Sequence, residues 1–129
     1  MPKRIPVLKV SGRGKLKVTF SSLNEVREIL YALLQLIEIG RVTTYGLLAR
    51  CLGIEPRSVA SILKKNPYPI IIPCHRVVKS DLSLSGYTLN GRRCPDFKKK
   101  LLILEGVRFD NEGKVCREHV VSTEDELLS

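Results

Sequence analysis

The chain has 129 residues, 43% of them hydrophobic, which suffices for one ordinary buried core and suggests one domain with at most a small appendage. Charges or prolines interrupt the apolar stretches every few residues, so none approaches the roughly 18 apolar residues that a membrane span requires. The first six residues, Met-Pro-Lys-Arg-Ile-Pro, lack the long apolar run and the small-residue cleavage site of a signal peptide. These features predict a soluble, cytoplasmic protein.

The charge of the chain is strongly basic. It carries 22 Lys and Arg against 13 Asp and Glu, a net charge of +9. Four of the acids fall in residues 118–129, which contain no Lys or Arg, so residues 1–117 carry 22 basic and nine acidic side chains, or +13. So basic a segment favours binding to a polyanion such as nucleic acid, because each phosphate that it neutralises releases bound counterions. A lysine-rich surface that serves only solubility would give the same total, so charge alone leaves both interpretations open.

Four cysteines stand at positions 51, 74, 94 and 116, no two of them closer than 20 residues. This spacing contains no close pair of the usual zinc-binding type, and we expect no metal site. A disulfide among Cys51, Cys94 and Cys116 stays open, since such bonds occur inside some thermophile cells. The scarcity of heat-labile residues, with one Gln and one Met, favours a hot source.

The first 40 residues predict an arm and a helix. A loose alternation of apolar residues over 1–20 is typical of a short hairpin or an ill-ordered arm, and we assign residues 1–21 to it. Residues 22–25 fit a capping box, and Gly40 is a natural stop for the helix that follows. The apolar residues of that helix recur at helical spacing: Val26, Ile29, Leu30, Leu33, Leu34 and Ile37.

A compact pair of short helices comes next. Thr43 or Thr44 can cap a helix that ends at Gly53, and Pro56 is well placed in the first turn of a second helix that runs to about Lys65. Two short helices joined by a tight turn containing Gly match a helix-turn-helix. A plain helical hairpin would look similar, so this pattern alone favours DNA binding only modestly.

The second half of the chain predicts shorter elements. Residues 66–69 break the helix, and the apolar run 70–72, which we expect to be buried, leads through Pro73 into Cys74. Residues 79–91, rich in Ser and Gly, predict a loop. Residues 107–121 alternate around a turn at 111–113 and predict a final hairpin, and the acidic residues 122–129 predict a frayed tail.

A further helix is predicted from about Pro95 to Glu105. Its lysines, Lys98 to Lys100, should point largely outward. Its apolar residues should point inward: Phe97, Leu101, Leu102 and Leu104.

Cys74 is the candidate nucleophile, because His75 and Arg76 follow it directly. The thiolate is the reactive form of cysteine, and basic or cationic neighbours make it available at neutral pH. A lone cysteine is more often a small buried core residue, so a Cys-His pair by itself favours the structural interpretation. The surrounding sequence reverses that balance.

Residues 66–78, Asn-Pro-Tyr-Pro-Ile-Ile-Ile-Pro-Cys-His-Arg-Val-Val, closely resemble the active-site signature of the O6-alkylguanine-DNA alkyltransferases. The similarity extends from about Val26 to Gly106. Residues 40–49 are similar to the family's segment ahead of its helix-turn-helix, Gly86-Tyr87 to its active-site loop, and residues 104–106 to its closing helix. The resemblance implies a mainly α fold with short β elements, a winged helix-turn-helix alkyltransferase catalytic domain, over residues 22–121.

The resemblance also implies an activity, namely DNA repair by direct reversal of damage. The alkyl group of O6-alkylguanine in double-stranded DNA would move irreversibly to Cys74 after the base is flipped out of the stack. Because the thioether product is stable, each molecule would act once and need no cofactor. Three alternatives remain open: a non-catalytic alkyltransferase-like lesion binder, whose members replace the cysteine; a winged-helix regulator; and, more weakly, a cysteine hydrolase.

Five residues would carry the chemistry, by their match to the family's motifs. Cys74 would accept the alkyl group, His75 would take the thiol proton through a water, and Glu105 would hold the imidazole in position. Asn66 would brace the turn ahead of Cys74. Tyr45 would donate a hydrogen bond to the flipped base and crowd the phosphate that must rotate.

The remaining candidate residues would hold DNA or line the pocket. Arg57 would enter the duplex and fill the gap left by the base. Further DNA contacts are expected from Thr44, Tyr45, Ser58, Arg76 and Ser80. The substrate pocket is expected to include Pro69, Ser85, Tyr87 and Thr88. Without the resemblance, each of these would be interpreted as a solvated surface residue or the edge of a core.

The chain departs from the family in two places. Members usually carry a longer N-terminal domain with a ribonuclease-H-like sheet, whereas about 20 residues precede the first helix here, so we expect no metal site of that domain. The N-terminal arm or a second copy of the chain, as a homodimer, would cover the exposed face. Leu89 stands where the family tends to have small residues, and it should narrow the pocket.

Overall fold

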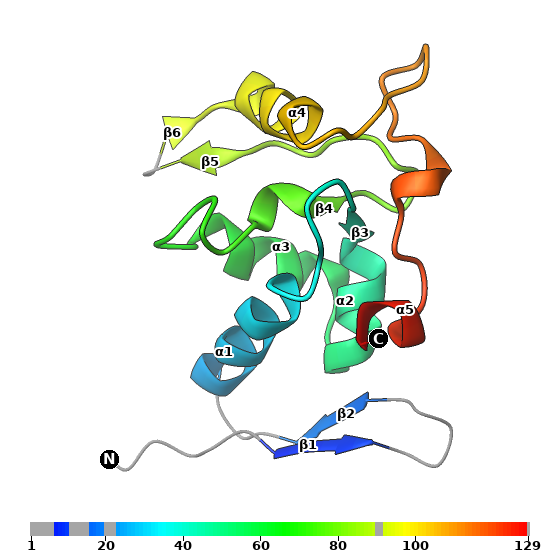
Figure 1. Ribbon diagram of the computed structural model, residues 1–129. Helices are drawn as coiled ribbons and strands as arrows, with labels where there is room; N and C mark the ends of the chain where they lie inside the picture. Colours follow the sequence, from blue (N-terminus) through cyan, green and yellow to red (C-terminus); the bar gives the residue numbers. More distant parts are fainter. Residues whose placement is uncertain (1–6, 11–15, 20–22, 90–91, 129) are drawn as a thin grey trace.

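The computed structural model describes residues 7–10, 16–19, 23–89 and 92–128. It confirms the predicted mainly α fold with short strands (Figure 1). Among the described residues, no helix is long and apolar enough to cross a membrane. The elements in chain order are β1 (Val7–Val10), β2 (Leu16–Thr19), α1 (Leu23–Leu34), β3 (Thr43–Thr44), α2 (Tyr45–Leu52), α3 (Pro56–Lys64), the 3-10 helix η1 (Cys74–Arg76), β4 (Val77–Val78), β5 (Thr88–Leu89), β6 (Arg92–Arg93), α4 (Pro95–Leu104), the 3-10 helix η2 (Arg117–His119) and α5 (Glu124–Leu128).

The N-terminal segment contains a hairpin, one of the two forms predicted for it. Strands β1 and β2 pair antiparallel, with Val7 opposite Thr19 and Val10 opposite Leu16. The hairpin lies beneath the helices in Figure 1, and β2 packs against α2. The connecting residues 11–15, and Ser22 of the predicted capping box, lie outside the described residues.

Helix α1 ends at Leu34, earlier than Gly40 where the sequence predicts its stop. The chain then tightens into 3-10-type turns, in which the amide of Ile37 donates to the Leu34 carbonyl. Ile37 is nevertheless buried, so the apolar pattern continues past the end of the helix. Gly40 has φ +87°, and a Cβ there would meet the Glu105 carbonyl oxygen at 3.1 Å, so the turn depends on glycine.

The helix-turn-helix is confirmed, and the local signals explain its boundaries. The Thr44 hydroxyl accepts a hydrogen bond from the Leu47 amide at 3.1 Å and caps α2. Gly53 ends α2 with φ +68°, in the left-handed conformation that glycine adopts at little cost. Pro56 begins α3, which packs against α2 and buries its apolar side: Val59, Ile62 and Leu63.

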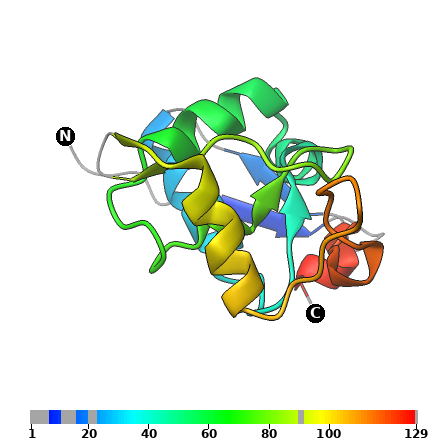
Figure 2. The same ribbon diagram turned by 90° about the horizontal axis from the view of Figure 1, so that it is seen from above.

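A small parallel ladder joins the helix-turn-helix to the segment that follows Cys74. Strand β3 pairs with β4, with Thr43 opposite Val77, and the two strands lie side by side at the centre of the molecule in Figure 2. On the other side of β3, Val42 bridges Val120 in parallel. The C-terminal segment thus extends the same ladder, and the start of α2 is held from both sides.

The expectation of a buried apolar run at residues 70–72 is wrong. Ile71 is 76% exposed and Ile70 is also exposed, while Ile72 alone is buried. The segment forms a tight turn, in which the Ile72 amide donates to the Tyr68 carbonyl at 2.8 Å and Ile70 has φ +77°. A turn of this kind directs its middle side chains outward, whatever their polarity.

Helix α4 is confirmed, but two of its side chains point the opposite way from the prediction. Lys98 is 1% exposed, and Leu104 is 83% exposed. Lys98 and Leu102 are four residues apart and therefore share the inward face of the helix. Leu104 lies two residues beyond Leu102, a rotation of roughly 200°, and so falls on the solvent side.

The predicted final hairpin is reduced to one antiparallel bridge between Phe109 and Val115. The Asp110 carboxylate holds the turn between them by accepting hydrogen bonds from the amides of Glu112 and Lys114, both at 2.9 Å. After the bridge the chain enters η2 instead of continuing as a strand.

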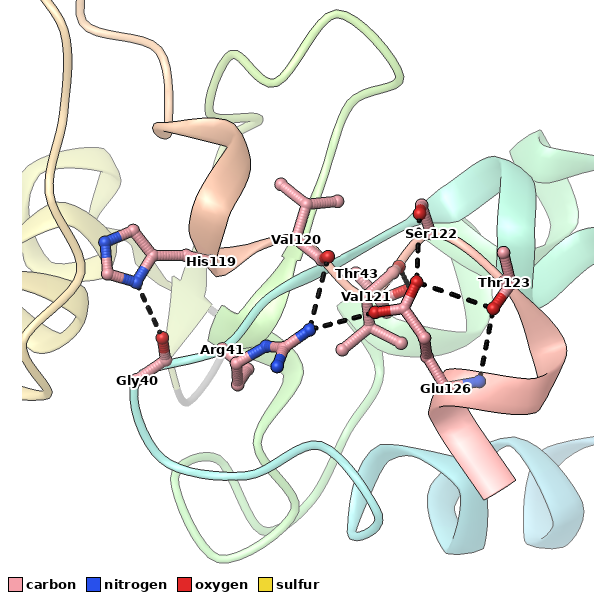
Figure 3. Close-up of polar contacts among 9 residues, drawn as sticks. All are labelled: Gly40, Arg41, Thr43, His119, Val120, Val121, Ser122, Thr123 and Glu126. Carbon is pink, nitrogen blue, oxygen red and sulfur yellow. Dashed lines mark hydrogen bonds and ion pairs between the residues drawn. The ribbon is translucent and has the colours of Figure 1, made fainter. Parts of the chain in front are cut away.

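The expectation of a frayed acidic tail is wrong. Residues 124–128 form α5, and Leu127 is buried against the core. The Thr123 hydroxyl accepts from the Glu126 amide at 3.2 Å, and the Glu126 carboxylate meets the Arg41 guanidinium at 3.1 Å (Figure 3). An amphipathic turn and a cap therefore anchor the acidic end of the chain.

Candidate active site

Cys74 is the first residue of η1, and the turn before it is braced. The Cys74 amide donates to the Ile72 carbonyl at 2.7 Å. The Asn66 side chain donates to the same carbonyl at 2.9 Å, while its amide oxygen accepts from the Tyr68 backbone N–H at 2.9 Å. One side chain thus ties both ends of the turn together.

Cys74 opens onto a pocket of about 370 Å³, within the size range of small-molecule sites. Four of the residues predicted beside it line this pocket: Tyr45, Ser85, Tyr87 and Thr88. Pro69 does not, because it belongs to the braced turn, where it bridges Ile72. Gly86 also lines the pocket, and the sequence analysis places this residue with Tyr87 in the segment that resembles the family's active-site loop. Sequence reasoning did not place the other lining residues: Ala60, Leu63, Lys64, Arg93 and Lys98.

His75 is fully buried, and its hydrogen bonds define its tautomer. Its Nε2 lies 3.0 Å from the Glu105 carboxylate, an acceptor, so this nitrogen carries the proton. Its Nδ1 is buried without a hydrogen-bond partner among the described residues. Burial lowers the pKa of His75, and this outweighs the opposite effect of Glu105. The ring is therefore neutral at pH 7, with a free lone pair on Nδ1.

Glu105 is held by two partners. The Arg76 guanidinium donates to both carboxylate oxygens, from Nε at 3.0 Å and from Nη2 at 2.7 Å. Burial raises the pKa of Glu105, but the hydrogen bonds and charges of Arg76 and His75 outweigh it, and the net pKa is lowered. A permanent carboxylate therefore orients the imidazole.

Arg76 does not take the position predicted for a DNA contact. Besides its two hydrogen bonds to Glu105, its Nη1 donates to the Ile37 carbonyl at 2.7 Å, and its side chain is 11% exposed. The guanidinium is thus engaged inside the domain, where it fixes the end of α4 to the segment that follows α1.

Lys98 lines the pocket, although the sequence analysis predicts that it points outward. Its Nζ donates to the Val77 carbonyl at 2.6 Å and to the Ser85 hydroxyl at 3.0 Å. Ser85 Oγ in turn lies 2.5 Å from the Tyr45 hydroxyl. Burial lowers the pKa of Lys98 to about 8 and raises that of Tyr45, which therefore remains a neutral phenol at pH 7. The signal was present, since Lys98 shares one helical face with Leu102 and Glu105.

Tyr87 also lines the pocket. The Tyr87 side chain is buried, and its ring packs against Phe97 with the ring centroids 6.2 Å apart. Burial raises the pKa of the Tyr87 phenol, and the neighbouring Cys74 sulfur raises it further. Leu89 pairs with Arg92 in the β5–β6 ladder, but its side chain is not among those described, so its effect on the pocket stays a prediction.

The predicted DNA-binding residues lie on the helix-turn-helix and beside it. Arg57 and Ser58 are exposed in the first turn of α3. Thr44 and Ser80 line a second hollow, of about 740 Å³, which also reaches Pro56 at the start of α3. The structure therefore gathers Thr44, Ser80 and the start of α3 on one face.

The other cysteines form no site. All four are free thiols, and burial raises the pKa of Cys51 to about 11, which leaves its thiol unreactive. Among the described residues, no cluster of His, Cys, Asp and Glu could hold a metal ion.

A helix-turn-helix beside a pocket lined by Cys74, with the neighbouring His75 hydrogen-bonded to Glu105, is the arrangement of a DNA-binding domain with a candidate cysteine nucleophile. Residues 25–107 match the model of the 6-O-methylguanine DNA methyltransferase, DNA binding domain, family. With this match over more than half of its length, the chain belongs to that family.

Curated relatives carry the name methylated-DNA–protein-cysteine methyltransferase. The relative from Pyrobaculum aerophilum is 51% identical over 105 residues, 79% of this chain and 68% of the relative. The relative from Thermococcus barophilus is 42% identical over 82 residues, 64% of this chain and 44% of the relative. The chain therefore spans from less than half to about two thirds of the length of these relatives.

Solved structures agree with the assignment. The O6-methylguanine-DNA methyltransferase of the hyperthermophilic archaeon Pyrococcus kodakaraensis has a TM-score of 0.53 and 41% identity, covering 63% of this chain and 46% of that one. The S. pombe protein Atl1, in complex with damaged DNA containing O6-carboxymethylguanine, has a TM-score of 0.64 and 26% identity, covering 78% and 98%.

Proposed function

We propose that this protein repairs DNA by moving the alkyl group of O6-alkylguanine irreversibly to Cys74. The observation that carries the proposal is the arrangement of Cys74 on the wall of a pocket, next in sequence to a neutral His75 that Glu105 orients. Membership of the family and the names of its curated relatives support the same activity.

The chemistry follows from the protonation states of the site. His75 accepts the Cys74 proton on Nδ1 through a water, and the sulfur attacks the alkyl carbon. The new S–C bond forms as the O6–C bond breaks, and the bonding electron pair stays on the guanine oxygen. Tyr45, a neutral phenol, donates a hydrogen bond to the departing base and disperses its charge. The guanine anion then takes a proton from water and His75 returns its proton to water, so atoms and charges balance.

The reaction ends with a thioether, and none of the described residues that line the pocket is suited to cleave it. We therefore propose one turnover per molecule and no cofactor. An oriented histidine activates the thiol, as in other cysteine nucleophiles. Here, however, the Cys74 sulfur keeps the alkyl group and is not regenerated.

We propose that α3 brings double-stranded DNA to the pocket. The target oxygen lies inside the base stack, so the nucleotide must be extruded at a cost of a few kcal/mol. Arg57, exposed at the start of α3, would enter the duplex and offset part of that cost. The charge of +13 over residues 1–117 supplies the phosphate attraction that holds the complex.

Intact-mass measurement tests the proposal directly. After incubation with duplex DNA containing O6-methylguanine, we expect one gain of about 14 Da on the Cys74 peptide, the stoichiometry of a single methyl transfer. Cys74→Ser should show no gain, and Cys94→Ser, at a half-exposed cysteine, should react like the wild type.

Two other outcomes would reject repair activity. Tight and lesion-selective binding without a mass gain would make this chain a lesion-binding protein. Indifference to the lesion together with a preferred DNA sequence would make it a helix-turn-helix regulator.

A further inference from the structure

Lys98 is a charged side chain in an unusual position. It is almost completely inaccessible, it lines the Cys74 pocket, and its two hydrogen bonds go to the Val77 carbonyl and the Ser85 hydroxyl. Neither of these acceptors is a carboxylate. A buried ammonium is costly unless it is well hydrogen-bonded, so a Lys at this position calls for an explanation beyond packing.

The hydrogen bonds around Ser85 restrict where its proton can go. A lysine ammonium can only donate, so Ser85 Oγ must accept from Lys98. Ser85 has one proton of its own, and its close neighbour is the Tyr45 hydroxyl at 2.5 Å. Two arrangements remain: either Tyr45 donates to Ser85, or Ser85 donates to Tyr45 and leaves the phenolic hydrogen of Tyr45 free.

The positive charge of Lys98 favours the second arrangement. An ammonium bound to Ser85 Oγ withdraws electron density from that oxygen, which makes it a weaker acceptor and a stronger donor. The Lys98 ammonium also lies 5.8 Å from the centre of the Tyr45 ring. A chain of donors then runs in one direction, from Lys98 through Ser85 to Tyr45, and ends at the pocket.

We propose that Lys98 and Ser85 are positioning residues that direct the Tyr45 hydroxyl hydrogen into the pocket, where it meets the extruded base. The inference rests on the proposed function and deepens it. In this arrangement the Tyr45 hydroxyl is oriented as a donor before the base enters the pocket. The charge that develops on guanine then strengthens the whole chain of hydrogen bonds. Without the relay, the phenol could turn its hydrogen toward Ser85 and present a lone pair to the base.

A double-mutant cycle tests the relay, with the single-turnover rate of methyl transfer measured at saturating O6-methylguanine duplex. Removing a donor aimed at developing charge typically costs 10²–10³ in rate, so we expect about a 100-fold loss for Tyr45→Phe. Ser85→Ala should lose about tenfold, the effect of one hydrogen bond. In the Tyr45→Phe background, Ser85→Ala should lose nothing further. Ser85→Thr, which keeps the hydroxyl, should restore the rate.

Two further measurements complete the experiment: the affinity for lesion DNA and the transfer rates of two lysine variants. The Kd for the lesion duplex, measured in a Cys74→Ser background, should change less than threefold with Ser85→Ala, because the relay acts on the transition state. Lys98→Met should slow transfer and abolish the effect of Ser85→Ala. The matched control Lys100→Met, at an exposed position on the same helix, should react like the wild type.

The outcomes separate the two levels of the proposal. A wild type that transfers the methyl group, combined with additive losses for Ser85→Ala and Tyr45→Phe, overturns the relay and leaves the repair function standing. A wild type that never gains the methyl group overturns the repair function and the relay with it. If Lys98→Met fails to fold, the Ser85 and Tyr45 cycle still decides the matter.

Discussion

Two of the Arg–Glu pairs among the described residues have nearly equal geometry but lie in very different surroundings. In the active site, Arg76 and Glu105 are separated by 2.7 Å, and their side chains are 11% and 15% exposed. At the C-terminus, Arg41 and Glu126 are separated by 3.1 Å, and their side chains are 37% and 42% exposed (Figure 3). The distances alone would rank the two pairs as similar.

Their surroundings separate them. The buried pair carries a third member, His75, and each of the three guanidinium nitrogens of Arg76 donates a hydrogen bond inside the protein. In the exposed pair, the Arg41 guanidinium also reaches the Val120 carbonyl at 3.4 Å, and water can replace either partner. The comparison teaches that burial, more than contact distance, decides whether an ion pair can hold a neighbouring group such as His75 in one orientation. An exposed pair of the same length has little such effect.

The largest effect is expected where the buried pair is broken. Glu105→Ala leaves the Arg76 guanidinium buried without its carboxylate, a change that typically costs about 3–5 kcal/mol of stability. Methyl transfer should also fall by at least about 100-fold, because the His75 imidazole loses its orienting group. Denaturant unfolding and single-turnover kinetics measure the two losses. A Glu105→Ala protein with unchanged kinetics would remove Glu105 from the mechanism.

Acid should affect the buried cluster before the exposed pair. The pKa of His75 is lowered in the folded protein, so below pH 6.5 the unfolded chain binds a proton that the folded chain does not. The lowered pKa of Glu105 acts in the same direction below pH 4.5. Stability should therefore fall as the pH drops below 6.5 and fall faster below 4.5.

The rate of methyl transfer gives a second readout of the same titration. It should stay constant near pH 7 and decline only below pH 6.5, when His75 loses its free lone pair. A pH–rate profile at saturating lesion duplex measures this midpoint. A midpoint above pH 6.5 would mean that burial does not control the pKa of the His75 imidazole.

Local signals explain which parts of the fold were predictable. The caps of the helix-turn-helix, Thr44 and Gly53, act within a few residues of themselves, so sequence alone places them. The Cys74-His75 pair was found because its motif is contiguous, and Glu105 because it closes a recognisable helix. Each of these depends on neighbours along the chain or on a matched motif, not on the three-dimensional packing.

The errors have the opposite origin. Lys98 was predicted to be solvated because lysine usually is, but its acceptors, Val77 and Ser85, lie 21 and 13 residues away. Arg76 was assigned to DNA, although its carbonyl partner at Ile37 lies 39 residues upstream. Burial of a charge requires acceptors brought by tertiary packing, and periodicity within one helix cannot reveal them. It could only have indicated that Lys98 shares a face with Leu102.

The C-terminal helix offers a test of packing without catalysis. Leu127 is buried against the core, so Leu127→Ala should destabilise the protein by about 2–3 kcal/mol, toward the lower end for core leucines because α5 is short. The transfer rate of the folded protein should not change, because α5 supplies no residue to the Cys74 pocket. Leu128→Ala, at the exposed neighbour, is the control and should lose less than about 0.5 kcal/mol. Equal losses for the two variants would contradict the packing of α5.

The smallest effect is expected at the exposed pair. Glu126→Gln removes the charge opposite Arg41 but keeps an acceptor for its hydrogen bond, so the free energy of unfolding should fall by less than about 1 kcal/mol. Because both partners are solvated, even this difference should shrink between low and high salt. The matched substitution Glu105→Gln should cost more at every salt concentration, since ions do not reach the buried pair. If the two substitutions cost the same and respond equally to salt, burial does not distinguish the pairs, and the orientation of His75 by a shielded carboxylate loses its physical basis.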